Sequence, residues 1–352
     1  MGEKLVSFFR VEVGGLIFEN APKPSDLGQP ISLSICHRDK EKTRLTLTVK
    51  DYDLDTENPF PVYNTLPNPR TSELVPVVAY IGWEDEPIVK AFEGLYAKIR
   101  ATYQPSRTEI IAIHGAMKLS KRGRVDVKKN LTLKEFITQK FAEEGITAQF
   151  HKSAAGDIAL TTPIEVFIQA GTQWDEVKMW LRANGYIWNT IKKDIVVIRR
   201  DKSDGQIIRL RRGDEHIISL EPSAEQKFDE KSGRRKGHAH EPKPGQRWSR
   251  LFEFTKDTSR AVEPVTPPIG KAAKGPHKVP LHRDSVRGRA KRHEIEGDQL
   301  RVTIRFRPEM RNEERIVISD FGRRIDGEYQ TVSVEHVLGG EPARTIIEAV
   351  RP

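Results

Sequence analysis

The sequence is poor in the residues that build disulfide scaffolds, zinc sites and membrane spans. Its 352 residues include one cysteine, Cys36, which excludes an internal disulfide and a cysteine-based zinc centre. No apolar run approaches the ~20 residues of a membrane-spanning helix, and the first residues lack the apolar core of a signal peptide. We therefore expect a globular chain that is made in a reducing cytoplasm and does not insert into a membrane.

Signatures of the common enzyme classes are also missing. There is no P-loop, no Gly-x-Gly-x-x-Gly between strand and helix, no His-Glu-x-x-His and no Gly-x-Ser-x-Gly. Cys36 falls on the polar side of an alternating run, which favours an inert strand residue over a nucleophile. Glu143 and Glu144 precede a helix stop and are expected to be solvated rather than paired for catalysis. We predict no catalytic, cofactor-binding or metal-binding residue, and a protein that is not an enzyme.

Three alternating aspartates, Asp51, Asp53 and Asp55, resemble the start of a calcium-binding loop of the EF-hand type. Such a loop needs Gly at its sixth place and Glu at its twelfth, where Thr56 and Val62 stand. We expect a solvated loop without calcium.

Histidines and arginines supply the remaining candidates. His238 and His240 form a His-x-His pair without an assignable third ligand, so metal binding there stays open. His336 lies in an apolar run and is expected to be a hydrogen-bonded structural residue. The arginine-rich segment 283–292 lacks the interleaved aromatics of a nucleic-acid site, which favours a solvated or protein-facing surface.

The chain is basic, with 59 Lys and Arg against 50 Asp and Glu, a formal charge of +9. Such an excess permits an anionic partner without demanding one. The excess of positive charge is not confined to one helix or arm, and aromatic residues make up only 7% of the sequence. We expect the excess to face outward or toward partner proteins.

Short alternating runs dominate residues 1–115. The runs 31–35 and 45–49 alternate apolar and polar residues, which is typical of half-buried strands. The run 88–99 also has helical spacing, but Gly94 within it and the flanking prolines favour strands. About six short antiparallel strands predict a β-barrel or sandwich.

Helical signals appear in residues 116–200. Thr132 and Glu135 form a capping box before an amphipathic run that Gly145 ends. A similar helix start at Thr172 precedes a second amphipathic run, whose apolar face includes Trp174 and Trp180. We assign these two tryptophans to the core. We expect short strand material over 158–168 and a hairpin over 186–198, which completes an α+β domain.

The remaining residues return to strand patterns. Residues 201–245 hold a predicted hairpin at 207–220 and a basic segment, part of which is expected to complete the first barrel. Residues 246–352 predict a second β unit, interrupted by a Pro-rich loop at 263–282 that is too polar to build a core. The fold of about 221–299 cannot be assigned from the pattern.

The end of the chain resembles a known family. Three apolar runs after residue 309 are separated by Asp326-Gly327 and Gly339-Gly340, which predict antiparallel strands joined by tight turns. This order resembles the closing module of phage late control gene D proteins, the baseplate hub proteins of contractile tails. The matching positions are Ile316, Ile318, Asp326, Gly327, Tyr329, Val332, Val334 and His336.

The resemblance extends over most of the chain and is weakest between residues 228 and 278. In the first unit it includes Tyr80, Gly82, Phe92 and Gly94. In the inserted domain it includes Gln169, Thr172, Trp174, Trp180, Leu181, Gly185, Ile195 and Val197.

This resemblance implies a mainly β fold, with two tube-like antiparallel β-barrel or sandwich domains and an inserted α+β domain. It implies a virion structural protein of the tail baseplate, made in the host bacterial cytoplasm. A homotrimer would adapt the sixfold tail tube to the threefold central spike, contact other baseplate proteins and let genomic DNA pass without specific binding. Two alternatives stay open: a basic nucleic-acid-binding protein and a hub-associated peptidoglycan hydrolase.

Overall fold

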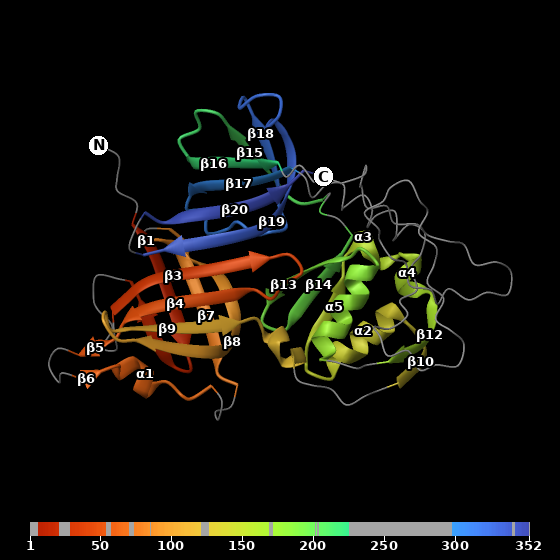
Figure 1. Cartoon of the computed structure of the whole chain (residues 1–352), viewed down its shortest axis with the longest axis horizontal. Coiled ribbons are helices and arrows are strands. Elements are labelled where there is room, and N and C mark those ends of the chain that lie inside the picture. Colours follow the sequence, from red (N-terminus) through yellow and green to blue (C-terminus); the bar gives the residue numbers. More distant parts are fainter. Residues whose placement is uncertain are drawn as a thin grey trace, which may run out of the picture.

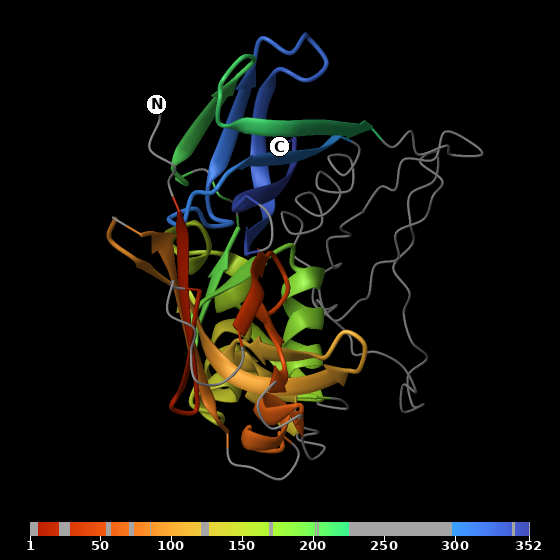
Figure 2. The same cartoon turned by 90° about the vertical axis from the view of Figure 1, so that its left-hand side faces the viewer.

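The structure is a computed structural model. It describes residues 6–20, 29–53, 58–69, 74–84, 86–120, 127–168, 172–200, 202, 204–224, 298–339 and 342–351. Figures 1 and 2 show three parts: an N-terminal β unit, a C-terminal β unit beside it, and an α+β unit packed against their junction.

The N-terminal unit is an antiparallel sheet in the order β3-β4-β9-β8-β7-β1-β2. Its strands β3, β4 and β9 cross β1 and β7 steeply in Figure 1, so the sheet folds over one shared core. The strands are β1 (Ser7–Val13), β2 (Leu16–Glu19), β3 (Gln29–Arg38), β4 (Arg44–Lys50), β7 (Pro76–Trp83), β8 (Val89–Thr102) and β9 (Arg107–Ile113). The expected strand over 88–99 is confirmed as β8, and Gly94 is required there because a Cβ would lie 2.5 Å from the carbonyl oxygen of Ile113.

The C-terminal unit contains six strands around a separate core. They are β15 (Ile207–Arg211), β16 (Ile217–Ala224), β17 (Asp298–Arg305), β18 (Arg315–Ser319), β19 (Gly327–Leu338) and β20 (Arg344–Val350). The order is β15-β18-β19-β20-β17-β16, so β15 and β16 are the two edges, yet only residues 212–216 separate them in sequence. The sheet must therefore curl until its edges approach each other, as in a barrel.

The two β units form one continuous sheet. Strand β19 pairs antiparallel with β3, from Ser333 opposite Arg38 to Leu338 opposite Leu33. Thirteen strands are thereby hydrogen-bonded in one network across both units. The mainly β fold is confirmed.

The α+β unit lies between the two β units in sequence. Its elements are η1 (Gly115–Ser120), β10 (Val127–Thr132), α2 (Leu133–Ala142), β11 (Thr147–Phe150), α3 (Lys152–Ala155), α4 (Ile158–Thr161), β12 (Pro163–Ile168), α5 (Gln173–Ala183), β13 (Ile187–Lys192) and β14 (Ile195–Arg199). Both predicted helix starts are confirmed, since the Thr132 and Thr172 hydroxyls accept from the backbone N–H three residues on. Trp174 and Trp180 are buried in its core.

Several local expectations were wrong. Residues 158–161 form the helical turn α4 rather than a strand, because the Asp157 carboxylate caps its N-terminus. Residues 58–76, whose richness in Pro and Asn predicts a long loop, contain β6 (Asn58–Pro59), which pairs with β5 (Tyr52–Asp53), and the short helix α1 (Pro61–Thr65).

The predicted hairpin at 207–220 does not form, because β15 pairs with β18 and β16 pairs with β17. Both strands extend the C-terminal sheet, so residues 207–224 do not complete the first barrel. Alternation in the sequence identified the strands correctly and said nothing of their partners.

The register of β16 and β17 places Ala224 directly opposite Asp298. The 73 residues of 225–297 therefore leave and re-enter the sheet at facing positions, where hairpins ordinarily have two to five residues. The Pro-rich loop 263–282, the segment 283–292, His238 and His240 all lie outside the described residues.

We predict that residues 225–297 can be replaced by Asn-Gly without loss of the fold. A two-residue turn can join facing strand ends, and all strand pairs of the described sheet would be kept. Thermal unfolding followed by circular dichroism should stay cooperative. A control deletion of 207–224, which removes two strands, should abolish that transition, and a shortened chain that also fails to unfold cooperatively would contradict the prediction.

Candidate assembly surface

The inner side of the β3–β19 seam is closed by buried histidines. His336 is fully buried, and its ring contacts the Thr345 hydroxyl at 3.2 Å and the Met310 carbonyl oxygen at 3.1 Å. His37 lies across the seam with its ring centre 6.1 Å from that of His336. Burial lowers the pKa of His336 to about 3, and burial also lowers the pKa of His37. The expected structural role of His336 is confirmed.

The outer side of the same seam is polar and half-buried. The Ser34 hydroxyl donates to Glu335 at 2.6 Å, and Arg38 donates to Glu348 at 2.7 Å. Cys36 lies 3.7 Å from the Ser333 hydroxyl, and burial raises the pKa of its thiol. A thiol with a raised pKa is a poor nucleophile, which agrees with the expected inert role.

This outer face continues along neighbouring strands. Ser34 lies opposite Thr46 of β4, and Glu335 lies opposite Ile346 of β20. The face that both cores leave open thus carries hydroxyl residues and an ion pair together with the apolar side chains of Val337 and Ile346. Exposed ion pairs of this kind contribute roughly 0–1 kcal/mol each.

All three units meet at one buried ion pair. Lys202, whose side chain is 1% exposed, lies 2.8 Å from the Asp39 carboxylate and also donates to the backbone carbonyls of Asn312 and Thr331. Asn312 donates to the same carboxylate at 2.9 Å. Burial lowers the pKa of Lys202 and raises that of Asp39, and each charge opposes the shift of the other.

The α+β unit reaches this cluster through β13. The backbone N–H of Lys40 donates to the carbonyl oxygen of Trp188 at 3.0 Å. The N–H of Thr43 donates to the Thr190 hydroxyl at 2.8 Å. The β3–β4 turn is therefore held on one side by β13 and on the other by Lys202.

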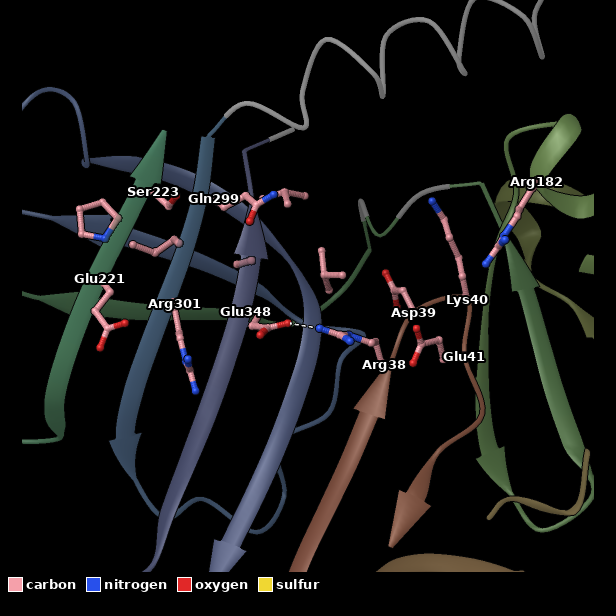
Figure 3. A pocket seen from close by; sticks show the side chains of 15 residues that line it. Arg38, Asp39, Lys40, Glu41, Arg182, Glu221, Ser223, Gln299, Arg301 and Glu348 are labelled. Atoms are coloured by element: carbon pink, nitrogen blue, oxygen red, sulfur yellow. Dashed lines mark hydrogen bonds and ion pairs between the residues drawn. The ribbon is translucent and has the colours of Figure 1, made fainter. Parts of the chain in front are cut away.

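An open groove of about 710 Å³ lies beside this junction (Figure 3). The β3–β4 turn supplies one wall, the C-terminal sheet another, and Arg182 of α5 approaches from the α+β unit. Its four basic side chains are matched by four acidic ones, so the groove has no bias toward an anion. These are Arg38, Lys40, Arg182 and Arg301 against Asp39, Glu41, Glu221 and Glu348.

A second, polar pocket of about 320 Å³ gathers acidic residues between the α+β and C-terminal units. Asp204 is 3.3 Å from Lys152, and Glu313 is 3.3 Å from Arg199, so both are engaged in ion pairs. Burial raises the pKa of Glu314 to about 7. Glycoside hydrolysis requires two cooperating carboxyl groups. In this pocket, Glu314 is the one carboxyl group that forms no ion pair with a described residue.

The expected solvated loop at Asp51 was wrong. Asp51 is fully buried, and its carboxylate accepts from the backbone N–H groups of Val62 at 2.7 Å and Tyr63 at 3.1 Å. The Thr108 hydroxyl donates to the same carboxylate. The Asp51 carboxylate thus satisfies two N–H groups in the first turn of helix α1 (Pro61–Thr65) from ten residues upstream of Pro61, and no local capping pattern in the sequence signals this role.

No group of three or more metal-binding side chains occurs among the described residues. Within the same residues, no helix is long and apolar enough to cross a membrane.

The positive charge is confined more narrowly than expected. Residues 225–297 hold 18 Lys and Arg and 10 Asp and Glu, which is eight of the chain's nine excess positive charges. The remaining 279 residues are therefore close to neutral. The expectation of a spread excess was wrong, because counting over the whole chain hides a local concentration.

We predict that Lys202→Met destabilises the protein by about 3–5 kcal/mol, because it leaves Asp39 buried without its partner. The matched control is Arg211→Met, which removes an ion pair with Asp320 whose side chains are 77% and 52% exposed. That loss should stay below about 1 kcal/mol. Urea unfolding measures both, and equal losses would contradict a special role for the buried pair.

We predict that His336→Gln costs less stability in acid than at neutral pH. The unfolded chain takes up a proton on His336 below about pH 6.5, whereas the buried ring in the folded protein stays neutral until about pH 3. The contribution of His336 is therefore complete above pH 6.5 and is lost as the pH falls. The difference between wild type and variant should shrink by about 2 kcal/mol between pH 7 and pH 5. It should not change between pH 7 and pH 8, and a constant difference down to pH 5 would refute the prediction.

No family model and no curated protein matches the sequence. Solved structures match over nearly its whole length. A 43 kDa tail protein of prophage MuSo2 from Shewanella oneidensis has a TM-score of 0.63 at 13% identity, covering 98% of this chain and 97% of that one. A tail protein from Neisseria meningitidis has a TM-score of 0.59 at 12% identity, covering 98% and 96%.

A third match is a component of the type VI secretion system of Escherichia coli, described as similar to bacteriophage tail proteins. Its TM-score is 0.55 at 10% identity, covering 96% of this chain and 76% of that one. At such identities the likeness concerns the fold alone. The chain therefore has the tail-protein fold that its resemblance to baseplate hub proteins implied.

Proposed function

We propose that this chain is a non-enzymatic structural protein of a phage contractile-tail baseplate. Three copies form a hub ring that joins the sixfold tail tube to the threefold central spike and lets the genome pass. The observation that carries the proposal is the fold match to tail proteins, which spans both chains almost completely. The match covers 98% of this chain in both cases.

The joined sheet supports this geometry. Each chain contributes two β units that are hydrogen-bonded edge to edge through β3 and β19. Three chains would present six β units around an axis, which is the number needed to meet a sixfold tube. Closed cyclic rings are the usual arrangement of homo-oligomers.

The polar outer face of the joined sheet is the surface that we assign to the channel. Ser34, Thr46 and Glu335 lie on it, and its ions Arg38 and Glu348 are paired. At the seam the cation on this wall, Arg38, is paired with Glu348, which weakens its attraction for DNA, so we expect the genome to pass this part of the wall without strong retention.

Nucleic-acid binding is the second candidate, and the charge of residues 225–297 favours it. It predicts strong, salt-dependent retention of duplex DNA by the purified chain. Under the hub proposal, retention should be weak at physiological salt. A hydrolase, the remaining alternative, would be revived by loss of turbidity when the chain is added to purified cell wall.

The hub proposal predicts a trimer of about 120 kDa, three times the 40.1 kDa chain. An obligate ring should bury more than about 2,000 Å² at each interface, so the trimer should persist at micromolar concentration. Sedimentation velocity across a concentration series measures this mass, with the chain in strong denaturant as the monomer control. A monomer at every concentration would overturn the proposal.

A further inference from the structure

Eight strands of the two β units form one layer, and the polar outer face belongs to it. Their order is β16-β17-β20-β19-β3-β4-β9-β8, and every neighbouring pair in this order is antiparallel. Figure 1 places β16 at the upper end of this eight-strand layer and β8 at its lower end. Seven strand spacings of about 4.8 Å, roughly 34 Å along the layer, separate the two end strands. The layer of one chain therefore ends in two separate edges.

Both end strands leave part of their edge unpaired. Strand β8 pairs with β7 only as far as Leu95, so residues 97–102 have β9 on one side and no described strand on the other. Strand β16 pairs with β17 and with no other strand that the structure describes. Lys98 and residues 100–102 are exposed, and so are residues 221–223. Unpaired edges of this kind can accept a strand of another chain.

The directions of the end strands fit a contact between two copies of the chain. Because eight strands alternate in direction, β8 and β16 run in opposite directions. Rotation about a ring axis keeps each strand's direction along that axis, so β8 of one copy would lie antiparallel to β16 of the next copy. Such a contact joins an N-terminal unit to a C-terminal unit. The two kinds of unit then alternate around the ring, as they do within each chain.

Charges alternate across the layer up to the β16 edge. Arg38 is paired with Glu348, Glu348 lies opposite Arg301, and Arg301 lies opposite Glu221. Figure 3 shows these four side chains in one row. Glu221 is the last of them and forms no ion pair with a residue that the structure describes. The β16 edge therefore ends in a negative charge that is open to a cation on its outer side.

The β8 edge ends in the opposite charge. Arg100 lies opposite Glu109 of β9, with 3.5 Å between guanidinium and carboxylate. Lys98 lies two residues earlier on the same face of β8 and forms no ion pair with a described residue. In a closed barrel the strands tilt and their register staggers, so the row of Glu221 meets a different row of the next copy. The charges of the two edges are complementary, and cross-strand pairs of opposite charge stabilise a sheet.

We propose that residues 97–102 of one copy lie along residues 218–223 of the next copy, and that this contact closes the hub ring. Lys98 and Arg100 would pair with Glu221, and the contact would cover Ile218, which is 54% exposed. A contact between two different edges is heterologous, and it yields a ring when the rotation closes. This inference rests on the proposed hub function and names its contact surfaces.

The contact agrees with the channel assigned to the outer face. Its ion pairs run sideways between neighbouring strands, as the pair of Arg38 with Glu348 does at the seam within each chain. They therefore leave the face itself open to the channel. Pro222 has no backbone N–H, so side chains rather than a complete backbone ladder decide which edge is accepted.

The test is a charge exchange in the full chain. Lys98→Glu/Arg100→Glu and Glu221→Lys should each weaken self-association by at least about tenfold, because like charges then face each other. The chain that carries all three substitutions should recover association to within about threefold of wild type, since opposite charges face each other again.

The matched control is Arg209→Glu/Arg211→Glu. These two arginines also alternate along an exposed strand, and Arg211 also forms an exposed ion pair, with Asp320. Their strand, β15, pairs with β18 outside the eight-strand layer. The control should leave the mass of the oligomer unchanged.

Sedimentation velocity across a concentration series gives the mass of each variant, and circular dichroism confirms that each is folded. Recovery in the threefold variant supports the contact, because a merely structural role of these residues would not produce it. Loss of association that the threefold variant does not recover would overturn the pairing of these edges. An oligomeric wild type whose mass none of the variants changes would overturn this inference and leave the hub function standing. A monomeric wild type would overturn both.

Discussion

The arrangement of the molecule depends on a buried ion pair between a linker lysine and a turn carboxylate. Lys202 follows the α+β unit, Asp39 lies in the first β unit, and the carbonyls that share the lysine belong to the C-terminal part of the chain. Burying two charges is costly unless every donor and acceptor is satisfied. Here the pair is surrounded by hydrogen-bonding groups of all three units, so it forms only when the units are correctly placed.

The continuous sheet follows from that placement. Strands β3 and β19 are about three hundred residues apart in sequence, and their pairing removes two free edges that would otherwise be open to foreign strands. Buried histidines close one side of the seam and small polar residues cover the other. The chain thereby gains a surface that runs over both units, which the proposed hub function requires.

Local physics made much of the fold predictable. The capping box at Thr132, the N-cap at Thr172, the alternating strands and the strand choice for 88–99 all depend on neighbouring residues, and all are confirmed. The site was harder to predict. Asp51 looked like a loop residue because its partner Thr108 is 57 positions away, and no local pattern reveals such a contact.

By itself, the sequence determined element types, the absence of a disulfide, and the likeness to tail proteins, because periodicity, composition and turn residues act over short distances. The tertiary structure alone decided which strands pair, why 207–224 joins the second β unit, and which charges are buried together. Strand alternation carries no information on partners, since any alternating strand can satisfy the backbone of another. Partner choice follows from the shared cores and from the cost of leaving a buried charge unpaired.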